Sequence, residues 1–506
     1  MGKKSFAVVS LILMLLLVSC YRPASRYEAW QVPASGSTLL SNAAITETPF
    51  TPATRAPGAL IVSPTPNPPK ELPTQRTESE QYIVQPGDTL AKIGMAYQVS
   101  VAQIMAQNDL INPDLIEVGQ APLIPAVSST DLGIGFKIIP DSELVYGPFS
   151  ALFNIEETVG EAGGYLAQYT EILDEMPFSG PEVVERVAQE YSVNPRLLLS
   201  VLEYKSGWVT CSQPAESTLI YPMGNYDSCC QGLYKQLAWA ANELNRGFYL
   251  WQLNALSVWI ISDGSVILID PTINAGTAGV QYLMTLLYDR QGWEDAVSEN
   301  GLFATFEGFF GYPFDYTYEP LLPESLEQPN FQLPFEPGLT WSFTGGPHGG
   351  WDDGSAWAAL DFAPPGEALG CYPSNAYVTA VAAGLIVRSE LGAVVQDLDG
   401  DGYEQTGWTI LYMHISSADR VTTGSYLEAG DLIGHPSCEG GFSTGTHLHI
   451  ARRYNGVWVS ADGQLPFMMD GWVSSGYGIE YDGYLVKDEQ TVEAWNGRSE
   501  TNQIWR

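Results

Sequence analysis

Histidines are the most concentrated source of chemistry in this chain of 506 residues. The chain has five of them, and all lie in its last third: His348, His414, His435, His447 and His449. Imidazole is both a metal ligand and a general acid or base near neutral pH. This clustering predicts a metal or acid–base site in the C-terminal region.

His447 and His449 are separated by one residue in the segment 446–450. Alternate residues of a strand lie on the same face, so both imidazoles would point to one site. Asp361, within the run 360–366, adds a carboxylate in the same region. Zinc binds imidazole and carboxylate ligands in a tetrahedron, and a catalytic zinc leaves one position for water. These residue types and this spacing are compatible with a zinc site.

Three motifs in this region resemble those of the lysostaphin-type zinc endopeptidases, which cut peptide cross-links in peptidoglycan. They are 346–350 with 360–366, then 411–414, then 443–450. The resemblance implies that His348, Asp361 and His449 hold Zn²⁺. It also implies that His414 and His447 form a catalytic pair beside the water and the scissile carbonyl. The division of roles between these two histidines stays open.

The spacing of the first motif departs from the family pattern. Twelve residues lie between His348 and Asp361, whereas the family usually places the aspartate where Asp352 stands here. The Asp-Phe-Ala-Pro-Pro-Gly context nevertheless belongs to Asp361. We interpret 350–359 as a loop insertion and predict Asp361 as the ligand, with Asp352 as the alternative. His435, which precedes Pro436, is interpreted as structural or substrate-lining.

The region 335–480 is expected to be an all-β, antiparallel peptidase domain, followed by a C-terminal tail at 481–506. Short runs rich in Val, Ile and Tyr, such as 378–382 and 410–413, alternate with glycine-rich turns.

One loop of this region has aspartates at alternate positions. Asp397, Asp399 and Asp401, followed by Gly402, resemble the start of a calcium-binding loop. Trp408 holds the position where such a loop has its last carboxylate. A Ca²⁺ site and a solvated acidic turn are the two interpretations.

The central region 130–330 is expected to be mostly helical. Helices are predicted at 181–191, 195–205, 233–244 and 278–287 from apolar periodicity and capping residues. The run 191–208 resembles the start of a lysozyme-like lytic transglycosylase domain. Lys205 stands where that family has its catalytic Glu, and Glu203 would point to nearly the opposite side of the helix. We therefore predict a non-catalytic helical domain that binds glycan or acts as a spacer.

Residues 81–126 have the order strand, helix, helix, strand. This segment resembles a LysM domain, a small βααβ module that binds glycans containing N-acetylglucosamine. The resemblance implies a glycan groove between the loop after the first strand and the loop after the second helix. The matching residues here are Gly87, Asp88, Thr89, Ile111 and Asn112.

The N-terminal residues 1–20 read as a bacterial lipoprotein signal peptide. Lys3 and Lys4 precede an apolar stretch at 6–18, which ends at a lipobox-like 17–20. Cys20 would carry the lipid anchor, and the Pro/Thr/Ser-rich segment 21–80 would be a linker. These features predict an extracytoplasmic protein that is attached to the cell membrane and acts at the cell wall.

Composition limits the partners and the disulfides. Acidic residues outnumber basic ones by 58 to 22, for a net charge of −36, which argues against nucleic acid as a partner. Outside the cytoplasm disulfides can form. We expect Cys371 to pair with Cys438, and Cys211 to pair with Cys229 or Cys230.

The combined prediction is a multidomain zinc endopeptidase that LysM targets to the wall. Its expected partners are peptidoglycan glycan strands and stem peptides. The alternative is a non-catalytic scaffold that binds peptidoglycan or activates other wall hydrolases.

Overall fold

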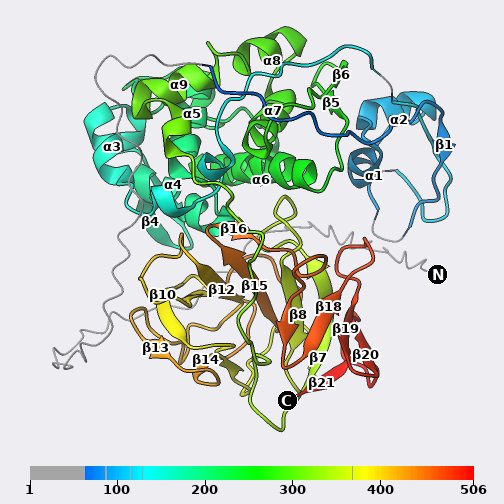
Figure 1. Cartoon of the computed structure of the whole chain (residues 1–506), viewed down its shortest axis with the longest axis vertical. Coiled ribbons are helices and arrows are strands. Elements are labelled where there is room, and N and C mark those ends of the chain that lie inside the picture. Colours follow the sequence, from blue (N-terminus) through cyan, green and yellow to red (C-terminus); the bar gives the residue numbers. More distant parts are fainter. Residues whose placement is uncertain (1–62, 86–87, 114, 128, 367) are drawn as a thin grey trace, which may run out of the picture.

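The computed structural model describes residues 63–506 except 86–87, 114, 128 and 367. They form a small βααβ unit, a helical domain and a β domain, in chain order (Figure 1). The predicted multidomain fold class is therefore confirmed. The predicted signal peptide, Cys20 and most of the predicted linker lie outside the described residues. Among the helices that are described, none is long and apolar enough to cross a membrane.

The βααβ unit has the predicted element order. Its elements are β1 (Glu80–Gln81), α1 (Leu90–Tyr97), α2 (Val101–Gln107) and β2 (Leu123–Ile124). β1 pairs antiparallel with β2, and a capping box at Ser100 starts α2. Its small core, built around Ile93 and Ile104, includes Val258 of the helical domain. Gln98 also donates a hydrogen bond to the carbonyl of Ala255 at 2.6 Å, so the unit is fixed to the helical domain.

The helical domain contains seven α-helices among the described residues, together with two β-hairpins. The helices are α3 (Ile155–Ala162), α4 (Gly180–Tyr191), α5 (Pro195–Ser206), α6 (Leu233–Gln252), α7 (Ala275–Leu287), α8 (Arg290–Ala296) and α9 (Leu302–Phe310). The hairpins are β3 (Thr170–Leu173) with β4 (Met176–Ser179), and β5 (Val258–Ile260) with β6 (Val266–Leu268). Short 3₁₀ turns lie at Asp141–Glu143, Pro148–Ser150, Tyr165–Gln168, Glu216–Thr218, Ser228–Cys230 and Pro313–Tyr316.

Start signals in the sequence explain which of these helices could be predicted. Ser179 and Glu182 form a capping box with Pro181 in the first turn of α4, and Asn194 caps α5 ahead of Pro195. Both predicted helices are confirmed. The helices α6 and α7 are longer than predicted, and α3, α8 and α9 were not predicted.

The β domain is antiparallel throughout its main sheet, as predicted. Its strands are β7 (Thr340–His348), β8 (Ala359–Ala363), β9 (Val378–Thr379), β10 (Gly384–Glu390), β11 (Ala393–Asp397), β12 (Trp408–Met413), β13 (Tyr426–Leu427), β14 (Leu432–Gly434), β15 (Leu448–Tyr454), β16 (Val457–Trp458), β17 (Met468–Met469), β18 (Trp472–Ser475), β19 (Tyr484–Lys487), β20 (Gln490–Glu493) and β21 (Gln503–Trp505). The main sheet has the order β13-β10-β11-β12-β15-β8-β7-β21, with β16 paired to β15.

The last residues of the chain belong to this domain. We expected a C-terminal tail at 481–506, but the structure includes these residues in the β domain. β21 pairs with β7, and Ile504 is completely buried. β19 and β20 extend a second sheet with β17 and β18.

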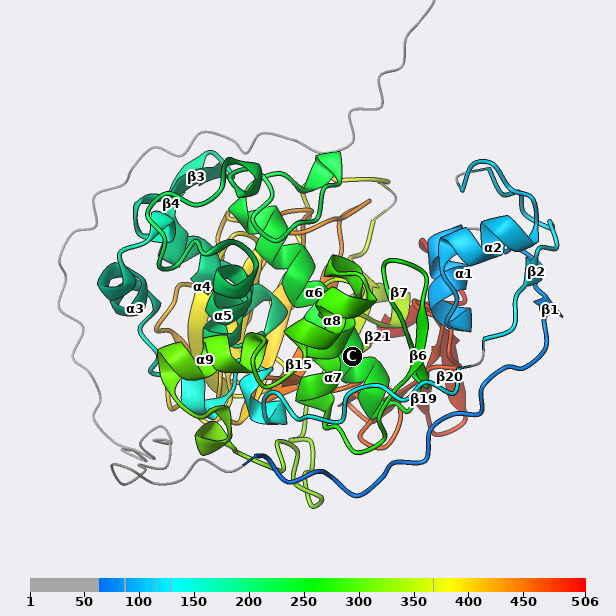
Figure 2. The ribbon, with the colours of Figure 1, turned by 90° about the horizontal axis from the view of Figure 1, so that it is seen from above.

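The two faces of the main sheet belong to two different cores. Ile410, Tyr412 and Ile450 point into the interior of the β domain. The alternate residues Leu411 and Ala451 share one continuous core with the helical domain. Seen from above, helices of that domain lie across the strands of the main sheet (Figure 2). Because side chains alternate along each strand, the residues of the central strands that point away from the interior of the β domain pack against the helical domain.

A buried charge cluster lies close to this interface. Glu404 accepts hydrogen bonds from Arg388 at 3.1 Å and from Arg453 at 2.6 Å, and the three side chains are at most 10% exposed. Arg453 also donates to the carbonyl of Gln189 on α4. Burial raises the pKa of Glu404, but the two guanidinium groups outweigh it and hold that pKa below its usual value.

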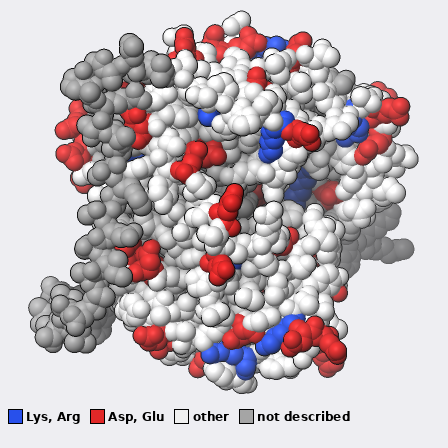
Figure 3. Space-filling model, in the orientation of Figure 1, with Lys and Arg blue, Asp and Glu red and all other residues white. Residues whose placement is uncertain are grey.

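The surface charge is dispersed. Figure 3 shows Asp and Glu side chains over both lobes of one face, with Lys and Arg in a few small groups. An acidic surface of this kind supports solubility.

Replacement of Glu404 should test the buried cluster. Glu404→Gln removes the carboxylate that binds both buried guanidinium groups, and we expect it to lower the free energy of unfolding by about 3–5 kcal/mol. Glu428→Gln, at an exposed position, is the control.

Because the pKa of Glu404 is lowered on folding, the contribution of its carboxylate to the free energy of unfolding is complete above about pH 4.3, the ordinary pKa of Glu. It is lost as the pH falls through the lower folded pKa, so the variant should lose less stability on acidification. Equal denaturation midpoints for Glu404→Gln and wild type would contradict this account.

Candidate metal centre

Asp361 and His449 are cross-strand partners in the middle of the main sheet. Asp361 lies on β8 directly opposite His449 on β15, and His348 ends β7 after a break in register. Asp361 is two residues from Ala359, and His449 is two residues from Ala451; both alanines face the helical domain. The three side chains therefore lie on the sheet face that this domain covers, and they are only 2–8% exposed.

The donor atoms of these three residues form a tight triangle. His348 Nε2 lies 3.2 Å from Asp361 Oδ1 and 3.0 Å from His449 Nδ1, which is 3.3 Å from the same oxygen. The other nitrogen of each ring meets a backbone carbonyl, Gly346 at 2.7 Å and Gly350 at 3.1 Å. A carbonyl can only accept, so these nitrogens carry the protons. The two remaining nitrogens therefore present lone pairs to each other and to the carboxylate.

This triangle has the dimensions of a zinc site. Zinc–nitrogen and zinc–oxygen bonds of about 2.0–2.1 Å separate ligands of a tetrahedron by roughly 3.3 Å. Asp361 Oδ1 is buried without a hydrogen-bond partner, which is costly unless a cation satisfies it. His348, Asp361 and His449 each offer one ligand atom, and these atoms lie within 4.8 Å of one another. The donors fit the predicted ion.

The protonation equilibria of the cluster follow from burial and from mutual charge. Burial opposes the charged form of Asp361, but His348 and His447 overcome it and hold the pKa of Asp361 well below its usual range. Burial would lower the pKa of His348, yet Asp361 raises it overall. Burial lowers the pKa of His449. It also lowers the pKa of His414 to about 3, with the neighbouring His447 and His449 adding to the effect.

A second histidine pair borders the triangle. His414 follows β12 in a left-handed conformation with φ of 64°, and its ring centroid lies 4.4 Å from that of His447. His414 Nδ1 donates to the carbonyl of Glu439 at 3.1 Å, and His447 Nδ1 donates to that of Gly445 at 2.8 Å. Because the pKa of His414 is lowered to about 3, its Nε2 is an acceptor at neutral pH. His447 Nε2 lies 3.8 Å from Asp361 Oδ2, so the pair adjoins the triangle of donors.

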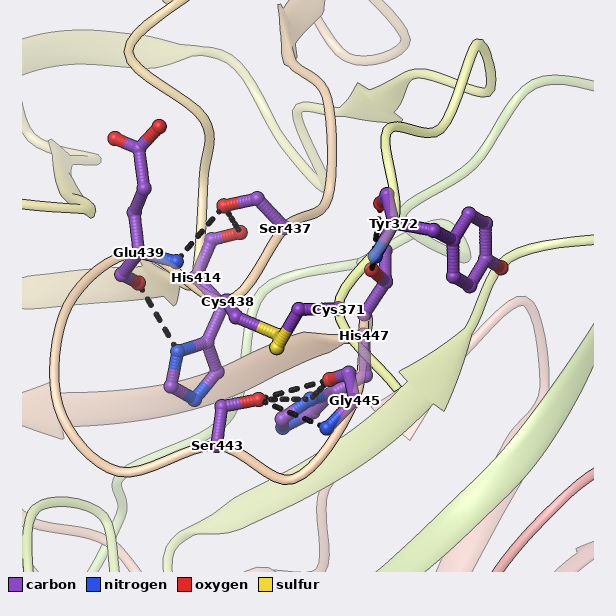
Figure 4. The surroundings of a disulfide bond; sticks show 10 residues. Cys371, Tyr372, His414, Ser437, Cys438, Glu439, Ser443, Gly445 and His447 are labelled. Atoms are coloured by element: carbon purple, nitrogen blue, oxygen red, sulfur yellow. Dashed lines mark hydrogen bonds between the residues drawn. A yellow bond between two sulfur atoms is a disulfide. The ribbon is translucent and has the colours of Figure 1, made fainter. Parts of the chain in front are cut away.

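A disulfide connects the segments that position this pair (Figure 4). Cys371 is bonded to Cys438, as predicted. Cys438 precedes Glu439, whose carbonyl binds His414. On the other side, Tyr372 exchanges two hydrogen bonds with Thr446, the residue before His447. The disulfide thus ties together the supports of both imidazoles.

The other cysteine prediction is wrong in this structure. Cys211, Cys229 and Cys230 are free thiols. Cys229 and Cys230 are sequence neighbours in one 3₁₀ turn, with their sulfur atoms 3.3 Å apart, while Cys211 lies in the exposed segment after α5.

Comparison with known families matches three successive parts of the chain. Residues 82–121 match the LysM domain, residues 137–323 match the LasA N-terminal domain, and residues 366–461 match peptidase family M23. The chain joins a LysM domain to an M23 peptidase domain. The M23 match contains His414, His447 and His449. His348 and Asp361 precede it, but β7 and β8 place them in the same sheet of the M23 domain.

Individual proteins are similar to parts of this chain. Protease LasA of Pseudomonas aeruginosa is 26% identical over 350 residues, which cover 64% of this chain and 75% of that protein. The N-acetylmuramoyl-L-alanine amidase XlyA of Bacillus subtilis is 42% identical over 53 residues, 10% of this chain and 18% of that protein. Among solved structures, the deep-sea M23 metalloprotease pseudoalterin matches with 23% identity and a TM-score of 0.29, covering 35% of this chain and 99% of that one.

The structure separates the two aspartates that the sequence left as alternatives. Asp361 is part of the triangle, whereas the carboxylate of Asp352 accepts a hydrogen bond from Tyr191 of the helical domain at 3.1 Å. The inserted loop between β7 and β8 carries Asp352 away from the donors. His435 donates from Nδ1 to the carbonyl of Ala376 at 2.9 Å, outside the metal triangle.

Sequence reasoning missed Tyr481. Its ring stacks on His348 with a centroid separation of 4.2 Å and an interplanar angle of 20°. Its backbone is left-handed, with φ of 68°, which is a strained conformation for a bulky residue. The amide of Gly346 donates to the carbonyl of Tyr481, and the amide of Tyr481 donates to the carbonyl of Pro347. These two hydrogen bonds join the end of β7 to the turn that contains Tyr481. The only local signal was the glycine-rich turn around it.

The aspartates of the loop 397–401 have hydrogen-bond partners within the loop. Asp397, Asp399 and Asp401 do lie close together. However, Asp397 accepts backbone hydrogen bonds from Asp399, Gly400 and Gly402, so its oxygens stabilise the turn. Burial, followed by the neighbouring Asp399, raises the pKa of Asp397 to about 7. The structure and the comparisons give no support to the Ca²⁺ prediction.

The predicted glycan-binding residues of the LysM domain lie in two loops. Gly87 lies outside the described residues. Asp88 accepts hydrogen bonds from Tyr82 and Gln85, and Thr89 caps α1. Ile111 is 97% exposed, beside Asn112 in the loop after α2. Asp88 and Thr89 thus shape their loop, and Ile111 offers an apolar contact surface.

Lys205 of the helical domain stands at the position where lytic transglycosylases have their catalytic Glu. Lys205 lies at the C-terminal end of α5 with its ammonium over the ring of Tyr288, and burial lowers its pKa. Glu203 accepts hydrogen bonds from the backbone of Val209 and from Thr210, so it holds the turn after the helix. The transglycosylase resemblance stays a prediction, since the family match for this region is the LasA N-terminal domain.

Metal content should distinguish the two aspartates. We expect purified wild type to bind one equivalent of zinc and Asp361→Asn to lose it, because the substitution removes an anionic ligand. Asp352→Asn is the matched control and should retain one equivalent, since its side chain lies against Tyr191. The measurement is elemental analysis after removal of loosely bound metal. Zinc retained by Asp361→Asn but lost by Asp352→Asn would reverse the assignment.

Proposed function

We propose that this protein is a zinc-dependent endopeptidase that cuts the peptide cross-links of bacterial peptidoglycan. The observation that carries the proposal is the buried triangle of His348, Asp361 and His449, with two lone pairs and one unpartnered carboxylate oxygen converging. The M23 match and the similarity to Protease LasA support a peptidase of this class.

His348, Asp361 and His449 would hold the zinc ion, and Gly346 and Gly350 fix the tautomers of the two imidazoles. When bound, zinc would lower the pKa of a water ligand and polarise the scissile carbonyl.

His414 and His447 would act on the reacting groups. Because the pKa of His414 is about 3, this imidazole is neutral at neutral pH. Its Nδ1 proton is engaged by Glu439, so Nε2 is free to accept a proton or to bind the nucleophilic water. His447 presents the same nitrogen from the other side of the pair. The pair would orient the water; an imidazole that accepts its proton at Nε2 could then donate that hydrogen to the charged tetrahedral intermediate.

The LysM domain would hold the enzyme on glycan strands next to its peptide substrate. Burial raises the pKa of Glu480, while the charges of His348 and of Lys92 on α1 act to lower it. Glu480 adjoins Tyr481, which stacks on His348. We propose that a glycan strand bound to the LysM domain presents its attached stem peptides to the metal centre. Attachment to the membrane through Cys20, and action at the cell wall, remain part of this proposal from the sequence.

Peptidoglycan zymography should test the activity. Wild-type protein is expected to clear the gel, and chelation of the metal or His449→Ala should abolish clearing, because each removes the ion or a ligand. Glu203→Gln is the control in the helical domain and should still clear. The products should carry new amino termini from peptide cleavage.

Clearing that survives both the chelator and His449→Ala would contradict the zinc mechanism. Clearing lost with Glu203→Gln, together with cleaved glycan strands, would assign the activity to the helical domain instead.

A further inference from the structure

The inserted loop between β7 and β8 supplies a contact to one of the proposed metal ligands. His449 Nε2 donates to the carbonyl of Gly350, the second residue of this loop, at 3.1 Å. This bond leaves the Nδ1 lone pair directed at Asp361 and His348. The orientation of the His449 ring therefore depends on the position of the Gly350 carbonyl.

The loop is a compact unit, so movement of its tip is transmitted to Gly350. The amide of Gly350 donates to the carbonyl of Ala356 at 3.0 Å. The Ser355 hydroxyl accepts from the amide of Trp351 at 3.0 Å and donates to the carbonyl of Asp352 at 3.2 Å. Gly350 also has no space for a side chain, because a Cβ there would lie 2.5 Å from the ring of Trp458.

The outer side of the loop is held by the helical domain. The side chain of Asn242, on α6, donates to the Asp353 carboxylate at 2.8 Å and accepts from the Gly354 amide at 2.8 Å. Arg246, one turn further along α6, forms an ion pair with Asp353 at 2.5 Å. Tyr191 at the end of α4 donates to Asp352 at 3.1 Å.

The contact with α6 is also close in the backbone. A Cβ on Gly354 would lie 2.1 Å from the carbonyl oxygen of Asn242, so only glycine allows the loop to approach this far. Asn242 itself is 6% exposed. The loop is thus seated against the helix by side-chain hydrogen bonds, an ion pair and direct backbone packing.

We propose that the helical domain is a positioning element for the metal centre: α6, through Asn242 and Arg246, holds the 349–356 loop so that Gly350 orients His449. The inference rests on the proposed function, because it concerns affinity for the proposed metal. Groups that orient a metal-binding imidazole typically change metal affinity by about 10–100-fold when they are lost. A loop released from α6 would sample other positions of the Gly350 carbonyl, and His449 would lose its fixed tautomer and direction.

The test compares full-length variants at the contact with a control elsewhere in the same interface. Asn242→Ala removes both side-chain bonds to the loop, and Gly354→Ala pushes the loop away from α6 without removing a polar group. Asp353→Ala, at a partly exposed loop position, gives a variant that leaves the helix untouched. Ser192→Ala is the control, because its hydroxyl bonds to the carbonyl of Gly456 across the interface at 2.7 Å and does not touch the loop.

Two measurements are made on metal-free protein. The dissociation constant for Zn²⁺ is obtained by competition with a chromophoric chelator, and the visible spectrum of the Co²⁺-loaded protein reports ligand geometry. The three contact variants are expected to bind Zn²⁺ about 10–100-fold more weakly and to show a changed Co²⁺ spectrum. Ser192→Ala should match wild type in both.

Contact variants that are folded by circular dichroism and keep the wild-type affinity and spectrum would overturn the inference. An equal loss of affinity in Ser192→Ala would also overturn it, since the effect would then belong to the interface in general. A wild-type protein that binds neither ion would instead overturn the proposed function.

Discussion

The electrostatic repulsion among three buried donor atoms is the constraint that the surrounding structure has to meet. His348 Nε2, His449 Nδ1 and Asp361 Oδ1 lie within 3.0–3.3 Å of one another, and backbone carbonyls hold the ring protons on the far side of both imidazoles. Lone pairs and a carboxylate at such distances repel each other unless a cation or a proton lies between them. The raised pKa of His348 expresses the same demand for positive charge. A divalent ion would satisfy all three donors and displace the proton.

The rest of the fold can be understood as support for this triangle. The central position of β8 and β15 fixes two donors by the register of the sheet, and the inner face of the sheet is packed within the M23 domain. The outer face, which carries the donors, is covered by the helical domain through a continuous apolar core and the Glu404 cluster. A metal ion bound at this boundary would take its ligands from the β domain, and we propose that the helical domain supplies contacts that position them.

Local patterns in the sequence predicted much of this arrangement. Capping residues before α4 and α5, alternation in the strands, and the His-x-His spacing are visible in short windows, and the context around Asp361 outweighed the simpler spacing of Asp352. What the sequence did not reveal depends on contacts between distant segments. Tyr481, between β18 and β19, stacks on His348, β21 pairs with β7 at the edge of the main sheet, and Asn242 on α6 binds a loop more than a hundred residues later in the chain. The free thiols of Cys211, Cys229 and Cys230 likewise follow from tertiary placement.

X-ray absorption at the zinc edge of the loaded protein tests directly whether His348, Asp361 and His449 bind the ion. The account predicts a first shell of nitrogen and oxygen only, at about 2.0–2.1 Å, with the outer-shell scattering of two imidazoles. A shell containing sulfur at about 2.3 Å would place the ion on thiols such as Cys229 and Cys230 and contradict the account. A shell with no imidazole scattering would contradict it equally.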